Sequence, residues 1–508
     1  MKTKGSLRSK LVSNVFYVAL EWVSNFALSL LYWFLVGKTL VPADYGVVYI
    51  FLNLTVLLSG FLPLGTSYAL TKLIPEYIGR NELGKITSAI RFTLNIILLM
   101  FGILAITFLI FSNNIAAILK VPIYIIWLIP ISALFYTLFY HQTSIIIGFQ
   151  HMRILATTAS IGYVLKVVIS GILIILGFKF FGPVIGFILS SLFIVLARIK
   201  YLLYNEKSIK IDGKSILLTF GMPALLTRMA YMVFTNTESL LLAFFHSASV
   251  VGIFGIGMLL SNQMSVISNI FSVALFPITS LLSAGQNTEK KRSRLINLIV
   301  RYTLLVTLPL IIFIILFASK LILLFSQASY LPAVSIIPIL AVGSLLFGLA
   351  GIFTDSLYAI GKPNVQRNLM IIATIIYAIL SVPLTYLFSV SGISITYTIS
   401  GLVLFVGSLI YLRKFLHFSP HLLSIGKLLL ANIISFSILF VLSMFAPNIV
   451  IAILFAIITG LIYLVVLMFL KFYTKEDVNI LEIAHNYLPF GKGIFKTITR
   501  TVSKFTSD

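Results

Sequence analysis

Five charged side chains stand inside long apolar stretches of the sequence. They are Glu21, Lys166, Arg228, Glu238 and Asp355. A charge that faces lipid at the centre of a bilayer costs about 2.5 to 3.5 kcal/mol on insertion scales. We therefore expect all five side chains to face a polar interior, where they could bind a substrate or an ion.

Arg228 and Lys166 are the candidate contacts for an anionic substrate. The planar donor fork of an arginine matches the oxygens of a phosphate or diphosphate, and desolvation strengthens such a contact. Arg228 is the principal candidate, and Lys166, midway along its apolar run, is the second. An alternative stays open for Lys166, in which the long side chain extends along its helix to the membrane surface.

Polar residues recur at spacings of three, four and seven, which keep side chains on one face of a helix. Three expected helices show this pattern, at Asn14, Glu21, Asn25 and Tyr32, at Arg228, Tyr231, Thr235 and Glu238, and at Asn262, Ser265, Asn269 and Ser272. These faces predict the wall of a hydrated cavity. The expected substrate-binding residues are Arg228, Lys166, Glu21, Asn25, Tyr231, Thr235, Asn262 and Asn269.

The acidic residues Glu21, Glu238 and Asp355 are candidates for ion coupling or gating. Glu21 either holds Arg228 in the empty state and releases it to the substrate, or titrates as part of proton coupling. In a third alternative it forms a permanent structural ion pair with Arg228. Glu238 stands towards the outer end of its run, which suits a gate or a cavity rim. Asp355 has a structural alternative, as a helix cap or a partner of Arg367. The sequence predicts no metal site and no cofactor.

The composition indicates that these charged residues lie in a membrane protein. Of 508 residues, 60% are hydrophobic and 10% are charged, and the mean hydropathy is +1.12. These values are typical of a multi-pass membrane protein rather than a water-soluble one. The absence of cysteine excludes disulfides, cysteine-bound zinc and iron–sulfur clusters.

Fourteen apolar runs are long enough to cross a bilayer as helices. They lie at 14–37, 47–70, 92–111, 121–148, 155–177, 180–200, 217–245, 249–282, 298–318, 333–360, 368–388, 391–412, 425–446 and 448–470. The sequence thus predicts an all-α membrane protein with about 14 transmembrane helices. Pro63 and Pro277 are expected to kink two of them.

The basic residues predict the orientation of these helices. With a cytoplasmic amino terminus, 30 of the 36 Lys and Arg residues fall on the cytoplasmic side and four on the outer side. Positively charged loops resist translocation, so both termini are expected in the cytoplasm of a cell-membrane protein. The same distribution accounts for the net charge of +23 without a nucleic-acid partner.

Two short patterns recur at similar offsets. Gly46 in the turn after the first run matches Gly252, 206 positions later, and Gly148 matches Gly361 at an offset of 213. We expect two six-helix lobes related by a pseudo-twofold axis, followed by an extra helix pair, an architecture found in transporters. The expected parts are a lobe at 1–203, a cytoplasmic linker at 204–216, a lobe at 217–415, helices 13 and 14 at 416–471, and a basic amphipathic cytoplasmic tail at 472–508.

Several segments resemble one family in their order and spacing. They are Leu40 to Gly46, Leu73 to Tyr77, Gly148 to Arg153, Phe220 to Pro223, Val251 to Phe254 and Gly361 to Pro363. Over about residues 1 to 470, the chain resembles the multidrug/oligosaccharidyl-lipid/polysaccharide exporter superfamily, and within it the polysaccharide-export, O-antigen repeat-unit flippase type. The resemblance implies two lobes around a central cavity and alternating access.

The resemblance also implies a function, which is to flip a lipid-(di)phosphate-linked oligosaccharide from the cytoplasmic to the outer leaflet. A drug or small-molecule antiporter coupled to an ion (H⁺ or Na⁺) is the alternative. The peptidoglycan-precursor flippases typically carry a cation where this first helix has Glu21, which disfavours that branch. We expect a monomer whose partners are the lipid-linked substrate and membrane lipids.

An enzyme is not expected. The sequence has no phosphate-binding loop of the Gly-x-x-x-x-Gly-Lys-Ser/Thr type and no acidic metal cluster in a loop. Its longest internal loops are too short for a catalytic domain. Without a nucleotide site in this chain, we expect an ion gradient or consumption of the product to drive transport.

Overall fold

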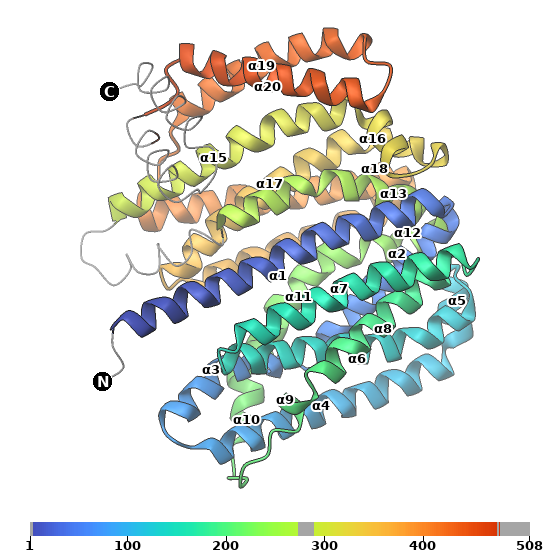
Figure 1. The fold of residues 1–508 in the computed structure, drawn as a ribbon, viewed down its shortest axis with the longest axis vertical. Helices are drawn as coiled ribbons and strands as arrows, with labels where there is room; N and C mark the ends of the chain where they lie inside the picture. Colours follow the sequence, from blue (N-terminus) through green and yellow to red (C-terminus); the bar gives the residue numbers. More distant parts are fainter. Residues whose placement is uncertain (1–3, 273–288, 475–476, 478–508) are drawn as a thin grey trace. The chain divides into compact units, whose positions relative to one another are not determined.

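The computed structural model describes residues 4–272, 289–474 and 477, and the regular elements in this part of the chain are helices (Figure 1). Contacts divide the chain into two compact units. Unit 1 comprises Met1–Leu259, Phe325–Ile336 and Met370–Ser400, and unit 2 comprises Leu260–Leu324, Ile337–Leu369 and Gly401–Asp508. These units are defined by contacts, whereas the two lobes were predicted from the sequence repeat. The lobe boundaries therefore stay a prediction.

Unit 1 contains the amino-terminal helices, coloured blue to green in Figure 1. They are α1 (Lys4–Thr39), α2 (Pro42–Phe61), α3 (Thr66–Gly79), α4 (Leu83–Ile110), α5 (Ser112–Leu119), α6 (Ile123–Gly148), α7 (Met152–Ile175), α8 (Phe181–Ala197), α9 (Ile199–Leu202), α10 (Gly213–Ser215), the π-helix η1 (Ile216–Gly221), α11 (Met222–Asn236), α12 (Glu238–Phe245) and α13 (Ala248–Ser261).

Unit 2 contains most of the remaining helices, coloured yellow to red. They are α15 (Glu289–Leu316), α16 (Ala318–Phe325), α17 (Ile337–Ala359), α19 (Leu422–Met444) and α20 (Ile449–Phe469). The 3₁₀ segment η2 (Ala328–Ser335) belongs to unit 1, and α18 (Pro363–Leu416) contributes to both units. In unit 2, α19 and α20 pack side by side and α15 packs against α17 and α19.

Eleven helices are long and apolar enough to cross a membrane, or up to twelve when the bent pair Ala248–Ser261 and Gln263–Ser272 counts as one span. This count covers the described residues and confirms a multi-pass membrane protein. The 54-residue helix α18 consists of two helices that meet at Ser389, whose φ of 53° is not helical. The apolar helix Phe181–Ala197 is shorter than the others. A total of fourteen spans stays a prediction.

The predicted runs at 47–70 and 217–245 are each broken in the structure. The run at 47–70 ends as α2 at Phe61 and resumes as α3 at Thr66, after Gly65 adopts a left-handed φ of 73°. Pro63 lies inside this break, so the expected kink is an interruption of the helix. The run at 217–245 is broken at Thr237, between α11 and α12. Pro277 lies outside the described residues.

The two repeated glycines meet within unit 1, where α2 crosses α13. A Cβ on Gly46 would lie less than 3.0 Å from the carbonyl oxygen of Ala248, and a Cβ on Gly252 would lie equally close to the carbonyl oxygen of Pro42. The contact is therefore reciprocal under the offset of 206, as a twofold relationship requires. This geometry supports the internal repeat predicted from the sequence.

Candidate functional site

Glu21 faces the helix pair α7 and α8 in unit 1. Its Oε1 accepts a hydrogen bond of 2.8 Å from the hydroxyl of Tyr163 on α7, and the carboxyl also interacts electrostatically with Arg198. Tyr32, about three helical turns further along α1 on the predicted stripe, is 1% exposed and donates to the carbonyl of Pro183. The stripe thus positions Glu21 and Tyr32 against neighbouring helices.

Arg228 on α11 is held by aromatic rings. Its guanidinium carbon lies 5.5 Å from the ring centroid of Tyr68 on α3 and 5.5 Å from that of Tyr140 on α6. The side chain is half-buried, and no ion pair joins it to Glu21 or to another carboxylate among the residues whose side chains the structure describes. Cation–π contacts can hold a guanidinium while its N–H groups stay available for an anion.

A group of tyrosines lies between Glu21 and Arg228. Tyr163 interacts electrostatically with Tyr140, and Tyr136 interacts with both Tyr163 and Arg228. The hydroxyls of Tyr136 and Tyr140 are 3.2 Å apart. The acid and the base are therefore connected through phenols rather than by direct contact. We call Tyr68, Tyr136, Tyr140, Tyr163 and Tyr231 the tyrosine cluster.

Of the tyrosine cluster, Tyr231 was predicted from the sequence as a substrate-binding residue, whereas the other four tyrosines were not predicted. Tyr68, Tyr140 and Tyr231 are 40%, 39% and 55% exposed. A detectable signal was the spacing of four between Tyr136 and Tyr140, which places both rings on one face of α6. Exposed phenols beside a guanidinium provide hydrogen-bonding and stacking surfaces at the same point.

Lys166 on α7 also faces an aromatic ring. Its Nζ lies 4.6 Å from the ring centroid of the buried Tyr32, and the side chain is half-buried. Asn25 accepts a hydrogen bond from Ser29 on its own helix and is exposed. Thr235 donates to the carbonyl of Tyr231, one turn earlier on α11. These residues lie in unit 1 together with Glu21 and Arg228.

Glu238 is buried at the break between α11 and α12, with 2% of its surface exposed. Its Oε2 has no hydrogen-bond partner among the described residues. The carboxyl interacts electrostatically with Tyr49 on α2 and Tyr377 on α18. The hydroxyl of Thr237 lies 3.4 Å from that of Tyr377. A buried carboxyl surrounded by phenols fits a proton-binding or gating role.

Arg198 is completely buried after α8. The charge count includes it among the cations expected on the cytoplasmic side. Its Nε, Nη1 and Nη2 donate to the Thr158 hydroxyl, the Thr143 hydroxyl and the Leu155 carbonyl at 2.7, 2.9 and 2.8 Å. Hydropathy did not reveal this burial, because the residue ends an apolar run. Arg198 ties α6, α7 and α8 together near Glu21.

Unit 2 holds the other predicted residues. Asp355 on α17 accepts a 2.6 Å hydrogen bond from the hydroxyl of Ser272. The Asn269 amide lies against Gly351 on the same helix, since a Cβ there would be 3.4 Å from its Oδ1. Asn262 is exposed between the two bent segments of the helix pair. Among the described residues, Ser272 is therefore the hydrogen-bond partner of Asp355, and Arg367, one of its expected alternatives, donates to Oδ1 of Asn368.

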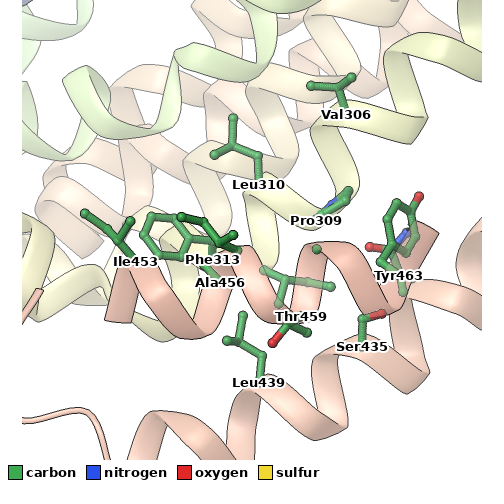
Figure 2. Close-up of a pocket in the computed structure, with 14 residues that line it drawn as sticks. Val306, Pro309, Leu310, Phe313, Ser435, Leu439, Ile453, Ala456, Thr459 and Tyr463 are labelled. Atoms are coloured by element: carbon green, nitrogen blue, oxygen red, sulfur yellow. Dashed lines mark hydrogen bonds between the residues drawn. The ribbon is translucent and has the colours of Figure 1, made fainter. Parts of the chain in front are cut away.

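Unit 2 also contains an apolar groove between α15, α19 and α20, which Figure 2 shows in close-up. Its volume is about 410 Å³. Val306, Leu310 and Phe313 line one side, and Leu439 and Ile453 line the other. Asn432 and Ser435 are buried on its wall, and Asn432 donates to the hydroxyl of Tyr463.

The sequence matches a protein-family model and a curated membrane protein. The family model described as polysaccharide biosynthesis protein matches residues 11–283. An uncharacterized membrane protein of Methanocaldococcus jannaschii is 23% identical over 436 residues, which cover 81% of this chain and 85% of the relative.

Solved structures share the fold. The lipid II flippase MurJ in an inward closed conformation superposes with a TM-score of 0.71 at 18% identity, covering 88% of this chain and 98% of the flippase. An inward-facing multidrug resistance MATE family transporter of the MOP superfamily superposes with a TM-score of 0.63 at 16% identity, covering 80% of this chain and 98% of the transporter. At these identities the matches establish the fold.

Proposed function

Since this chain belongs to the polysaccharide biosynthesis protein family and has the fold of the multidrug/oligosaccharidyl-lipid/polysaccharide exporter superfamily, we propose that it flips a lipid-(di)phosphate-linked oligosaccharide across the membrane. The substrate moves from the cytoplasmic to the outer leaflet by alternating access. Its sugar then serves surface polysaccharide or glycoprotein assembly. The family match confirms the resemblance that the sequence showed.

The environment of Arg228 is the observation that carries the proposal. A half-buried guanidinium between Tyr68 and Tyr140 has an anion-binding fork and lacks a carboxylate partner among the described side chains. A diphosphate supplies the missing negative charge, and its oxygens accept two parallel hydrogen bonds from the fork. The exposed phenols of the tyrosine cluster are suited to sugar hydroxyls and ring faces.

The remaining predicted residues have supporting roles in this proposal. Lys166 is the second cation, and Asn25, Tyr231, Thr235, Asn262 and Asn269 line the route of the polar headgroup. Glu21, Glu238 and Asp355 provide coupling or gating. The chain acts as a monomer in the cell membrane with both termini in the cytoplasm. Transport is driven by a gradient of H⁺ or Na⁺ or by consumption of the product. The predicted boundaries of the two lobes, the linker, the helix pair and the tail are part of this proposal, and the tail beyond Asp477 lies outside the described residues.

Ion-coupled drug antiport is the second candidate function. The match to the MATE transporter and the buried carboxyl of Glu238 favour it. A cationic drug, however, would meet Arg228 and Lys166 on its route, and like charges in a partly buried site repel. The charge of the transported molecule therefore separates the two functions.

A reconstituted transport assay tests the proposal. Proteoliposomes containing the full chain are given a polyprenyl-diphosphate sugar or an organic cation, and transfer of each is measured. We expect transfer of the sugar lipid, its loss in Arg228→Ala, and normal transfer in Arg80→Ala. Arg80 is a matched control because it forms a solvent-exposed ion pair with Glu76. Wild-type transfer by Arg228→Ala, or transport of the organic cation alone, would refute the proposal.

A further inference from the structure

A polar pocket of about 420 Å³ lies in unit 1, where the first turns of α1 meet the turn between α6 and α7. Hydroxyl, amide and cationic side chains line it, namely Ser13, Asn14, Tyr17, Gln150, Arg153 and Lys200. Asn14 belongs to the polar face of α1 that was predicted from the sequence. None of these residues is among the substrate-binding residues proposed above.

One wall of this pocket is a turn held by hydrogen bonds. The chain reverses at Gln150, whose φ is 58°, and the backbone N–H of His151 donates to the carbonyl of Ile146. A hydrogen bond of 2.8 Å joins Nδ1 of His151 to the hydroxyl of the buried Tyr201 on α9. The Nζ of Lys200 lies 5.4 Å from the ring centroid of Tyr201. The pocket is therefore formed by fixed elements before any ligand arrives.

Two cations line the pocket from different helices, Arg153 from α7 and Lys200 from α9. Neither forms an ion pair with a carboxylate among the described side chains, and no acidic residue is among the described residues that line the pocket. Residues 1–12, which precede the pocket on α1, contain four cations and no acid. The acids nearest in the sequence are Glu21 and Glu206, and they interact with tyrosines on α7 and after α9. A guanidinium fork and an ammonium at one pocket suit a phosphate.

The helices α1 and α7 pack side by side (Figure 1), and polar residues follow the seam between them away from the pocket. On α1, Glu21 follows Asn14 by seven residues, which is about two turns on the same face. On α7, Tyr163 follows the lining residue Met152 by eleven residues, or about three turns on the same face. Tyr163 donates to Glu21 across the seam. The seam therefore joins the pocket to the tyrosine cluster beside Arg228.

We propose that this pocket, here called the loading pocket, binds the phosphate of the lipid-linked sugar before the headgroup reaches Arg228. The proposal rests on the flipping function proposed above and adds a first binding step to it. Arg153 and Lys200 contact the phosphate, and Asn14 and Tyr17 hydrogen-bond to sugar hydroxyls. A phospholipid headgroup offers the same phosphate, but a resident phospholipid has no use for the polar seam, which favours the transported headgroup.

Protection of a cysteine in the loading pocket tests this proposal, because the chain has no cysteine of its own. The full chain carrying Ser13→Cys is labelled with a maleimide in detergent, with and without farnesyl-diphosphate N-acetylglucosamine as the probe. At a probe concentration ten times its dissociation constant, labelling should slow about tenfold, since only the unoccupied pocket reacts. The matched control Ser208→Cys, at an exposed position between α9 and α10, should be labelled at the same rate with and without the probe.

The two cations are tested in the chain that carries Ser13→Cys. Adding Arg153→Gln/Lys200→Gln should raise the probe concentration for half-protection about tenfold, because cations at the membrane surface attract anionic headgroups. The matched control Lys207→Gln/Lys210→Gln removes two exposed charges outside the pocket and should raise it less than about twofold.

Three outcomes would overturn the proposal. The first is equal labelling of Ser13→Cys with and without the probe, a comparison that holds even where a double variant fails to fold. The second is an equal shift in both double variants, which would show unspecific surface attraction. The third is equal protection by dioleoyl phosphatidylglycerol at the same concentration, which would assign the pocket to phospholipid. Labelling does not require transfer. Transfer without protection therefore overturns the loading pocket alone, and protection without transfer refutes flipping alone.

Discussion

Gly46 and Gly252 pack against each other's helix where α2 crosses α13. The residues that they contact, Ala248 and Pro42, are themselves equivalent under the repeat offset of 206. Gly46 meets the carbonyl of Ala248, and Gly252 meets the carbonyl of Pro42. Close backbone approach of this kind requires glycine, because there is no space for a Cβ. The crossing joins the starts of two repeat-equivalent helices within unit 1.

Replacing Gly46 by alanine should therefore destabilise the protein. The added Cβ would lie within 3.0 Å of the Ala248 carbonyl, so the backbones must separate. Overpacking costs about 1 to 3 kcal/mol, and we expect a clear drop in the unfolding temperature measured in detergent. Gly79→Ala is the matched control, since a Cβ on Gly79 meets nothing within 4 Å. Equal unfolding temperatures for the two variants would contradict the crossing.

A double-mutant cycle should couple Glu21 to Tyr163. The Tyr163 hydroxyl donates to the Glu21 carboxyl at 2.8 Å, and hydrogen bonds to charged groups contribute about 1.5 to 3 kcal/mol. Glu21→Gln and Tyr163→Phe should be non-additive in the free energy of unfolding, whereas Glu21→Gln and Arg228→Gln should add. Chemical denaturation of the reconstituted protein measures both cycles. Additive effects of the Glu21 and Tyr163 substitutions would contradict the hydrogen bond between these residues. Strong coupling between Glu21 and Arg228 would contradict their separation.

Arg228 should depend on the ring of Tyr140 rather than on its hydroxyl. The guanidinium carbon lies 5.5 Å from the ring centroid, and a partly buried cation–π contact contributes about 1 to 2 kcal/mol. We expect Tyr140→Phe to keep most sugar-lipid transfer and Tyr140→Ala to lose about fivefold to tenfold, measured in proteoliposomes. Equal impairment of the two variants would mean that the hydroxyl, not the ring, is required.

Arg198 should be a structural residue that lysine cannot replace. Its three nitrogens each donate a hydrogen bond, and the side chain is fully buried. A lysine presents a point charge without the planar fork, so it would leave buried acceptors without donors. We expect Arg198→Lys to cost about 2 to 4 kcal/mol of unfolding free energy. Arg153→Lys, at an exposed position on α7, should change stability by less than about 0.5 kcal/mol. Comparable unfolding curves for the two variants would contradict this role.

The membrane class and the positions of most helices followed from local chemistry. A run of apolar residues long enough to cross a bilayer must form a helix, because lipid offers no partner for backbone N–H and C=O groups. The repeat was visible for a similar reason, since Gly46 and Gly252 mark equivalent turns. The interruption at Gly65 goes beyond the kink that Pro63 predicted, and the break at Thr237 was not predicted from the sequence.

The partners of the buried charges were decided by tertiary packing. Helical periodicity indicated which side of α1 carries Glu21, but not that α7 and Tyr163 lie opposite that side. The sequence analysis treated Glu21 and Arg228 as possible partners, yet in the structure the tyrosine cluster lies between them. Arg198 shows the same limit, because its burial depends on three helices that converge around it. Because burying a charge in lipid is costly, the sequence alone determines which residues need polar surroundings. Only the packing of helices that are distant in the sequence determines which atoms supply those surroundings.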